Sequence, residues 1–271
     1  MNIVKDMRKN DPRWITGTGS IIGTREYQQD YVYCCSCENG LLGVVCDGMG
    51  GLDGGEIASS TAAEALGEAF AGRDVRMPVP EFLKEQAVII NDRVAALTGK
   101  NGAPLRAGTT MVAVVAEEDR LYWLSVGDSR IYIIRNEEMS QVNREHNYRL
   151  TLQESLKSGL ITREQYEAEE KKGQADALIS YLGISRLSLM DINRAPLEMM
   201  DGDIVLLCSD GLFKSLSDSQ IKALVRDNDM DLDIAADRLC QMAFSRRRGG
   251  QDNTSVLLLQ YRKLEGQGRT I

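Results

Sequence analysis

The fold is decided by the stretch LLGVVCDGMGGLDGGEIAS, which spans residues 41–59. Its opening run, LLGVVC, is apolar in the manner of a buried strand and leads directly into Asp47 and a glycine-dense turn. A helical pattern begins just after the turn, at about Glu56. The stretch therefore predicts a carboxylate that is held at the end of a buried strand.

Four more aspartates have comparable settings, namely Asp30, Asp128, Asp210 and Asp252. Each is next to a Gly, Asn or Gln and lies at the edge of an apolar or alternating run. We interpret the five as one site, although a single Asp beside Gly is more often a turn or cap residue. Burying several like charges together is prohibitive unless a cation neutralises them, and an all-oxygen set favours Mg²⁺ or Mn²⁺ over zinc.

Outward from this stretch, strands and helix pairs are predicted from local patterns. A hairpin is expected over residues 31–47, because Asn39-Gly40 is the strongest turn signal in the chain. A strand over residues 14–24 precedes it, and about ten polar residues at the start are expected to be frayed. Helices are expected over 56–71 and 81–97, followed by three or four strands over 109–142, which we interpret as a meander.

The second half of the chain begins with a charged segment, residues 143–182, that has helical spacing without a strong apolar face. We interpret this segment as a flap-like excursion on the surface. The remaining predictions are strands over 188–193, 203–208 and 254–261 and helices over 218–227 and 231–247. Because no linker is convincing, we predict a single domain over residues 1–271 with a core at about 14–261. Many strands with inserted helix pairs fit a β-sandwich flanked by helices better than alternating βαβ units.

The composition is that of an ordinary globular protein, since 271 residues with 43% hydrophobic content can fill a substantial core. A formal charge of −8 and a pI near 4.9 argue against nucleic acid and against an anionic membrane as partners. No run approaches the roughly eighteen apolar residues of a membrane span, and the first residues lack the apolar core of a signal peptide. We therefore expect a cytoplasmic protein.

The cysteines are expected to be free thiols. The sequence has no CxxC pair and a single histidine, and most of the cysteines lie in apolar strand-like runs where a thiol behaves as a small hydrophobe. The six are Cys34, Cys35, Cys37, Cys46, Cys208 and Cys240.

A set of short motifs, in order along the chain, resembles the protein phosphatase 2C family, the metal-dependent PPM-type Ser/Thr phosphatases, in its bacterial form. The motifs are DGMGG at 47–51 with GEIAS at 55–59, AGTT at 107–110, GDSR at 127–130, LLCSDGL at 206–212 and QDNTSV at 251–256, with REYQQD at 25–30 as a looser match. The resemblance implies an α+β fold, a four-layer αββα sandwich in which two antiparallel β-sheets are flanked by helix pairs.

The resemblance also implies roles for the aspartates at a binuclear Mn²⁺ or Mg²⁺ centre. Asp47 resembles the carboxylate that bridges the two metals, and the carbonyl of Gly48 resembles a further ligand. Asp210 and Asp252 resemble the carboxylates that complete the centre. Asp128 resembles the ligand of a third, weaker metal, which Asp210 would share.

Three further residues match positions beside the metals. Arg25 falls where the family places the guanidinium that holds the substrate phosphate, a task suited to a planar and permanently charged fork of donors. Asp30 would orient the site or ligate through water, and Asn253 would hydrogen-bond near the same shell.

The implied activity is hydrolysis of phosphoserine and phosphothreonine in proteins by a metal-activated water, without a phosphoenzyme intermediate. The implied partners are phosphorylated proteins and an opposing Ser/Thr kinase, with no nucleic acid and no membrane. Two alternatives stay open: a catalytically silent phosphoprotein-binding module on the same fold, and a two-metal phosphatase for small phosphate esters.

The sequence departs from the family pattern at several positions. Gln28 and Gln29 stand where acidic or amide residues are frequent, so water-bridged ligation is expected there, and Met49 replaces a frequent histidine. For His146 a surface or loop-anchoring role is favoured over proton transfer. Arg246, Arg247 and Arg248 could form a docking patch, although a solvated helix end is the more common meaning of such a run.

Overall fold

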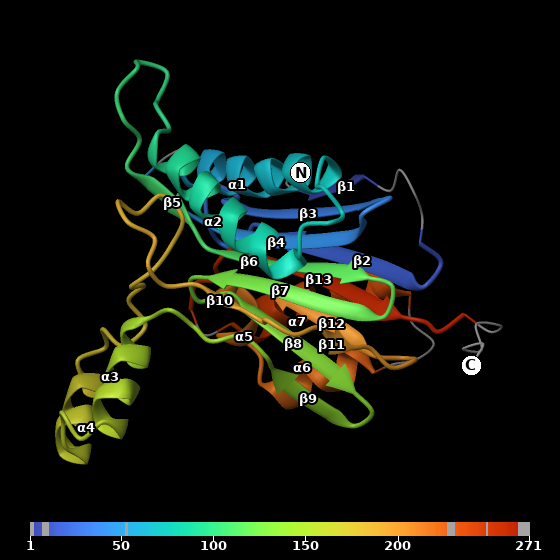
Figure 1. Ribbon diagram of the computed structural model, residues 1–271. Coiled ribbons are helices and arrows are strands. Elements are labelled where there is room, and N and C mark those ends of the chain that lie inside the picture. The colour runs from blue at the N-terminus through green and yellow to red at the C-terminus, as the bar shows by residue number, and fades with distance from the viewer. Residues whose placement is uncertain (1–2, 7–10, 52–53, 227–230, 248, 265–271) are drawn as a thin grey trace.

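Two β-sheets pack face to face in the computed structural model, and helices cover the outer face of each sheet (Figure 1). The structure describes residues 3–6, 11–51, 54–226, 231–247 and 249–264. One apolar cluster fills the space between the sheets, and a further cluster lies between each sheet and its helices. The predicted four-layer αββα sandwich is confirmed.

The first sheet has eight strands in the order β1-β3-β4-β6-β7-β10, with β5 paired to β4 and β11 paired to β7. Its strands are β1 (Ile3–Asp6), β3 (Asp30–Cys37), β4 (Gly40–Gly50), β5 (Ala107–Thr109), β6 (Met111–Glu117), β7 (Arg120–Val126), β10 (Asp191–Ile192) and β11 (Leu197–Glu198). Among the described strands, β1 alone pairs in parallel, with β3. The start of the chain was expected to be frayed, which is wrong for residues 3–6; residues 1–2 and 7–10 lie outside the described residues.

The second sheet has five strands in the order β2-β13-β12-β8-β9, and all of its pairs are antiparallel. Its strands are β2 (Trp14–Ile21), β8 (Arg130–Arg135), β9 (Glu138–Gln141), β12 (Ile204–Cys208) and β13 (Thr254–Tyr261). The two strands β2 and β13 come from opposite ends of the chain and pair along their whole length, from Thr254 opposite Ile21 to Tyr261 opposite Trp14.

The chain crosses from the first sheet to the second between β7 and β8. The predicted meander over residues 109–142 is therefore wrong, because the β6–β7 pair belongs to the first sheet and the β8–β9 pair to the second. Gly127 makes the crossing with φ +105°, and a Cβ there would lie 2.6 Å from the Thr110 side chain. Only glycine fits this turn, which places Asp128 between the two sheets.

The outer layers are helices that pack closely on the sheets. Helices α1 (Gly54–Ala71) and α2 (Val79–Ala95) cover the first sheet, whereas α5 (Asp210–Phe213), α6 (Asp218–Val225) and α7 (Leu232–Arg246) cover the second. A Cβ at Gly67 would lie 2.4 Å from the Tyr33 ring, and one at Gly17 would lie 2.1 Å from the Leu232 backbone. These glycines let α1 approach β3 and let α7 approach β2.

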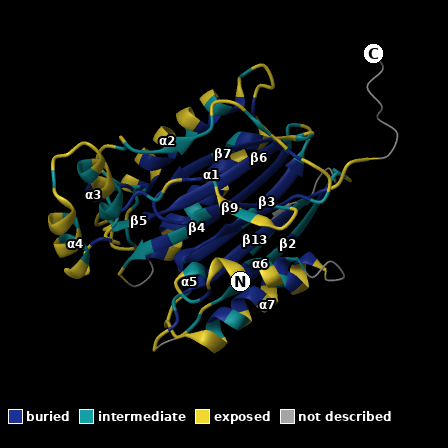
Figure 2. Cartoon of the chain, turned by 90° about the horizontal axis from the view of Figure 1, so that it is seen from below, coloured by how far each residue is buried: buried dark blue, intermediate teal, exposed yellow. Residues whose placement is uncertain are grey.

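The segment 143–182 carries the helices α3 (Tyr148–Lys157) and α4 (Arg163–Lys171), which project from one end of the sandwich (Figure 1). Figure 2 shows α4 mostly exposed and α3 a mixture of exposed and half-buried residues, in contrast to the buried strands. The base of the segment is anchored by His146: its N–H donates to the Gly127 carbonyl at 2.8 Å, and its own carbonyl accepts from Ile179 N–H at 2.9 Å. None of the described helices is long and apolar enough to cross a bilayer.

Candidate active site

Asp30 and Asp47 face each other across the first hairpin. Asp30 begins β3 and Asp47 lies near the end of β4, and the strand register pairs them directly. Ser209, in the turn after β12, donates from Oγ to Asp30 Oδ2 at 2.7 Å. A contact between the two sheets thus fixes Asp30 beneath the site, where its side chain is fully buried.

The AGTT motif at residues 107–110 holds the backbone of Asp47 from both sides. Asp47 N–H donates to Thr110 Oγ1 at 3.1 Å, while Thr110 N–H and Thr109 Oγ1 donate to the Asp47 carbonyl at 2.9 and 3.0 Å. The next residue, Gly48, packs so tightly that a Cβ would lie 2.1 Å from the Gly55 carbonyl oxygen. The glycine-dense turn is therefore needed to bring the start of α1 against the end of β4.

Asp128 and Asp210 come to the same place from two other strand ends. Asp128 follows β7 at the sheet crossing, and Asp210 begins α5 directly after β12. A Cβ at Gly211 would lie 2.2 Å from the Asn253 carbonyl oxygen, so the turn around Asp210 packs directly on the QDN segment. The glycines in GDSR and SDGL therefore serve close backbone approach at the site.

Asp252 and Asn253 come just before β13 and meet the loop that carries Arg25. Arg25 Nη2 lies 2.6 Å from Asp252 Oδ2, and the Arg25 side chain is 58% exposed. Asn253 donates from Nδ2 to the carbonyls of Ile22 and Tyr27 at 2.9 and 3.0 Å, and its Oδ1 accepts from Gln29 N–H at 2.8 Å. The three hydrogen bonds of Asn253 all join it to backbone groups of this loop. Asn253 therefore holds the loop in place.

A cavity of about 340 Å³ gathers these residues. Seven of the eight residues predicted for the site line it, namely Arg25, Asp47, Gly48, Asp128, Asp210, Asp252 and Asn253. Asp30 is the exception, since it is buried behind Asp47. The cavity is also lined by Gln29, Met49, Gly50, Thr110 and Leu178, the last of which comes from the projecting segment.

Burial and mutual repulsion act on the carboxylates. Burial raises the pKa of Asp47 well above its ordinary value, and the charges of Asp30, Asp210, Asp128 and Asp252 raise it further. Burial likewise raises the pKa of Asp30 to about 7 and that of Asp128 to about 6. The fold therefore holds acidic groups together against their electrostatic preference, and positive charge at the cavity would relieve the repulsion.

The residues at the cavity fit a hard divalent cation. They offer carboxylate and backbone carbonyl oxygens, and Asp210 Oδ1 is buried without a hydrogen-bond partner in the described part of the chain. Two carboxylate oxygens at the cavity are already paired with basic side chains of the same chain. Lys214 pairs with Asp210 Oδ2, and Arg25 pairs with Asp252 Oδ2. In the described part of the chain, no group of three or more acidic, cysteine or histidine side chains is arranged so that it could hold a metal ion.

Sequence reasoning missed Lys214 and Ser209. Lys214 is four residues after Asp210, a spacing that brings side chains together on a helix, and this was the available signal. The two glutamines brace loops: Gln28 donates to Ser20 Oγ at 2.9 Å and Gln29 donates to the Gly50 carbonyl at 3.0 Å.

His146 is fully buried, so the surface role considered for it is wrong, whereas its hydrogen bonds are those of a loop anchor. Its Nδ1 accepts from Gly127 N–H at 3.1 Å, directly before Asp128. Burial lowers the pKa of His146 to about 4, which keeps the ring neutral near pH 7.

Comparisons with known proteins agree with this architecture. A profile of the family described as protein phosphatase 2C matches residues 19–230. Protein phosphatase PhpP of Streptococcus pneumoniae is 31% identical over 238 residues, which cover 87% of this chain and 92% of PhpP. The serine/threonine phosphatase of S. agalactiae has a similar structure, with a TM-score of 0.78 and 26% identity over 92% of this chain and 100% of that chain.

The catalytic domain of the phosphatase PstP, solved in complex with two manganese ions, gives a TM-score of 0.72 and 26% identity over 92% of this chain and 99% of that chain. The matches to the family profile and to PhpP each cover most of the chain. The chain therefore belongs to the protein phosphatase 2C family of metal-dependent protein serine/threonine phosphatases.

Proposed function

We propose that this protein removes phosphate from phosphoserine and phosphothreonine in proteins, at the cavity around Asp47. The observation that carries the proposal is the convergence of four aspartates on one cavity, with an exposed arginine among the lining residues. The carboxylates require cations, and those cations together with the Arg25 guanidinium would complement the negative charge of a phosphate monoester. The family to which the chain belongs supports the same reading.

Asp47, Asp210 and Asp252, together with the Gly48 carbonyl, would hold two Mn²⁺ or Mg²⁺ ions. When bound, two such ions lower the pKa of a water molecule toward neutrality and offset charge on the phosphoryl oxygens. Asp128 and Asp210 would share a third, weaker ion. That ion would compete with Lys214, which already pairs with Asp210.

The other residues of the site bind and orient. Arg25 would turn from Asp252 to the phosphoryl oxygens, which its 58% exposed side chain permits. Asp30 lies opposite Asp47 on the neighbouring strand and accepts a hydrogen bond from Ser209 of the other sheet, so it would orient the ligand shell around Asp47. Asn253 holds the loop between β2 and β3, on which Arg25 lies.

We infer that water attacks phosphorus directly, without a phosphoenzyme. Among the described lining residues there is no serine, cysteine or histidine. The one hydroxyl there, Thr110 Oγ1, is already bonded to Ser129 Oγ at 2.8 Å and to Asp47 N–H. The substrates would be supplied by an opposing Ser/Thr kinase, since hydrolysis requires a prior phosphoryl transfer.

The proposal is tested by replacing Asp47 or Asp210 with asparagine, which keeps the shape and removes the charge. Each variant should lose turnover of a phosphothreonine peptide in Mn²⁺, because the cation site loses a charged ligand, while circular dichroism should show a folded protein. Asp237→Asn is the matched control, since Asp237 is exposed on α7 and does not line the cavity. Hydrolysis by Asp47→Asn at the wild-type rate would show that the site is assigned wrongly.

A further inference from the structure

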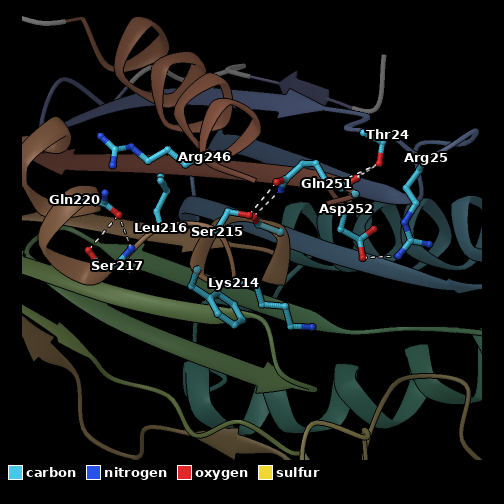
Figure 3. Close-up of a pocket in the computed structure, with 13 residues that line it drawn as sticks. Thr24, Arg25, Lys214, Ser215, Leu216, Ser217, Gln220, Arg246, Gln251 and Asp252 are labelled. Carbon is cyan, nitrogen blue, oxygen red and sulfur yellow. Dashed lines mark hydrogen bonds and ion pairs between the residues drawn. The ribbon is translucent and has the colours of Figure 1, made fainter. Parts of the chain in front are cut away.

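A second cavity, of about 900 Å³, adjoins the proposed active site. The two cavities share Arg25 and Asp252 as lining residues. Figure 3 shows these two residues at one end of the second cavity and Arg246 with Gln220 at the other, with Ser215 and Gln251 between them. No described residue of segment 143–182 lines it. The cavity therefore extends from the phosphate site along the α5–α7 side of the sandwich.

The lining of this second cavity is basic in a strongly acidic protein. It carries Arg25, Lys214 and Arg246 against a single acidic residue, Asp252, whereas the whole chain has a formal charge of −8. Positive charge has thus been gathered beside a site that acts on anions. Such local complementarity favours association with a negatively charged partner.

Arg246 is the cation of this lining that has no partner within it. Arg25 is paired with Asp252 and Lys214 with Asp210. Arg246, by contrast, is exposed at the end of α7 and makes no hydrogen bond or ion pair with the other residues drawn in Figure 3. Its guanidinium therefore has donors to offer a ligand.

Gln220 adds a neutral donor at the same end. Its Oε1 accepts from Ser217 N–H at 2.9 Å, within the first turn of α6, and this fixes the amide plane. The Nε2 group is then left to donate to a ligand. A guanidinium and an amide N–H group at one end of a cavity suit an anionic group with several acceptor oxygens.

We propose that the second cavity binds an anionic side chain of the protein substrate, a few residues along the chain from the phosphorylated residue. This inference depends on the proposed function, because the phosphoryl group at Arg25 sets where the peptide enters the second cavity. The anionic group can be the carboxylate of Asp or Glu or a second phosphoryl group, since both present acceptor oxygens to Arg246 and Gln220. The preferred substrates are therefore acidic or multiply phosphorylated segments.

The test compares kcat/KM for four substrates in saturating Mn²⁺. Three are phosphothreonine peptides in which the phosphothreonine is flanked on both sides by Glu, by phosphoserine or by Lys. The fourth is p-nitrophenyl phosphate, which is too small to reach Arg246. Wild-type protein should prefer the Glu and phosphoserine peptides over the Lys peptide. Arg246→Ala should lower kcat/KM for the acidic peptides by about twofold to fivefold, the usual range for an ion pair at an exposed site. Turnover of p-nitrophenyl phosphate should not change.

Charge reversal and a matched control sharpen the test. Arg246→Glu should shift the preference toward the Lys peptide, and 0.5 M salt should weaken the wild-type preference because exposed charges are screened. Arg238→Ala removes another exposed arginine from α7 that does not line the cavity, and it should behave as wild type. If Arg246→Ala removes the preference for only one of the two acidic peptides, the Glu peptide or the phosphoserine peptide, that result identifies which anion the cavity binds.

The possible failures are distinct. Turnover of all substrates with no preference for acidic peptides, or an equal effect of Arg246→Ala and Arg238→Ala, would overturn this inference and leave the proposed function standing. No turnover of any substrate with any metal would contradict the proposed function and this inference with it.

Discussion

Asp128→Asn should make the protein more stable and less active. Burial, together with the nearby charge of Asp210, raises the pKa of Asp128 from 3.8 to about 6, so the fold resists ionising this carboxyl group. At pH 7.5 the group is ionised in both folded and unfolded protein, and the shift corresponds to about 3 kcal/mol of lost unfolding free energy. Asp128 is only 7% exposed, so solvent screening reduces this value little. For a chain of 271 residues, about 3 kcal/mol is about 5 °C in Tm.

The pH dependence of this gain follows from the sign of the shift. The folded pKa lies above the unfolded pKa, so the proton-linked stability is present below about pH 4 and is lost as pH rises through about 6. Asparagine does not titrate. The Tm difference between variant and wild type should therefore be small at pH 4 and reach its full size above pH 6.5.

The assay is thermal unfolding in excess chelator across this pH range, followed by the same scan in Mn²⁺ and by peptide turnover. In Mn²⁺ the gain should shrink, because a cation relieves the repulsion in the wild type, and activity of the variant should be low and partly restored by extra Mn²⁺. Asp237→Asn should show neither effect. A Tm for Asp128→Asn at or below the wild-type value in chelator at pH 7.5 would refute the reasoning.

Two further substitutions test the supports of the site. Gly48→Ala would place a Cβ 2.1 Å from the Gly55 carbonyl oxygen, and it should abolish most activity and most of the Mn²⁺-induced rise in Tm. Gly51→Ala is the control and should keep both, because a Cβ there meets no atom within 4 Å. Similar behaviour of the two variants would contradict the packing argument. Burial lowers the pKa of His146 from 6.5 to about 4, so the unfolding free energy should fall by about 3 kcal/mol as the pH drops through this range. His146→Asn keeps an acceptor for Gly127 N–H but does not titrate. In a pH series of Tm, this variant should therefore lose that part of the slope. An unchanged slope in this variant would show that His146 does not titrate in this way.

Local pattern was sufficient for elements with strong turn signals and periodicity. The first hairpin turns one residue earlier than the predicted Asn39-Gly40 pair, at Glu38 and Asn39, and Gly40 follows with φ +107° opposite Cys37. The turn fixes the register of the hairpin, and with it the pairing of Asp30 with Asp47. The last strand, Thr254–Tyr261, agrees with its prediction at both ends, because a continuous apolar run bounded by QDN leaves little choice. Short elements such as β10 and β11 have only two residues each and carry no periodicity to detect.

Which sheet a strand joins could not be predicted from local pattern. Strands β6, β7 and β8 all show apolar alternation and tight connections, and nothing in their composition shows that the chain changes sheet at Gly127. That crossing depends on contacts with Thr110 and His146, which are distant in sequence. The same limit explains Ser209, whose bond to Asp30 joins residues 179 positions apart.

The aspartates of the candidate site could be predicted because each lies at a strand end beside a residue that permits a turn. Among their neighbours, Leu178 could not be predicted, because it reaches the site only through the tertiary fold, whereas the four-residue spacing between Asp210 and Lys214 was a local signal. Lys214 pairs with Asp210, and Leu178 comes from the projecting segment. Charge and shape at the edge of the cavity, which we expect to govern substrate choice, are therefore set by residues that sequence motifs do not mark.

The central claim is tested most directly by phosphate release from a phosphothreonine peptide and from p-nitrophenyl phosphate, each measured with Mn²⁺, with Mg²⁺ and with excess chelator. We expect turnover of the peptide with either metal and none with chelator, since the carboxylates around Asp47 need cations to act. Tight metal binding without turnover of the peptide would contradict the claim and indicate a module that binds phosphoproteins without hydrolysing them. Turnover of p-nitrophenyl phosphate alone would contradict it in favour of a phosphatase for small esters.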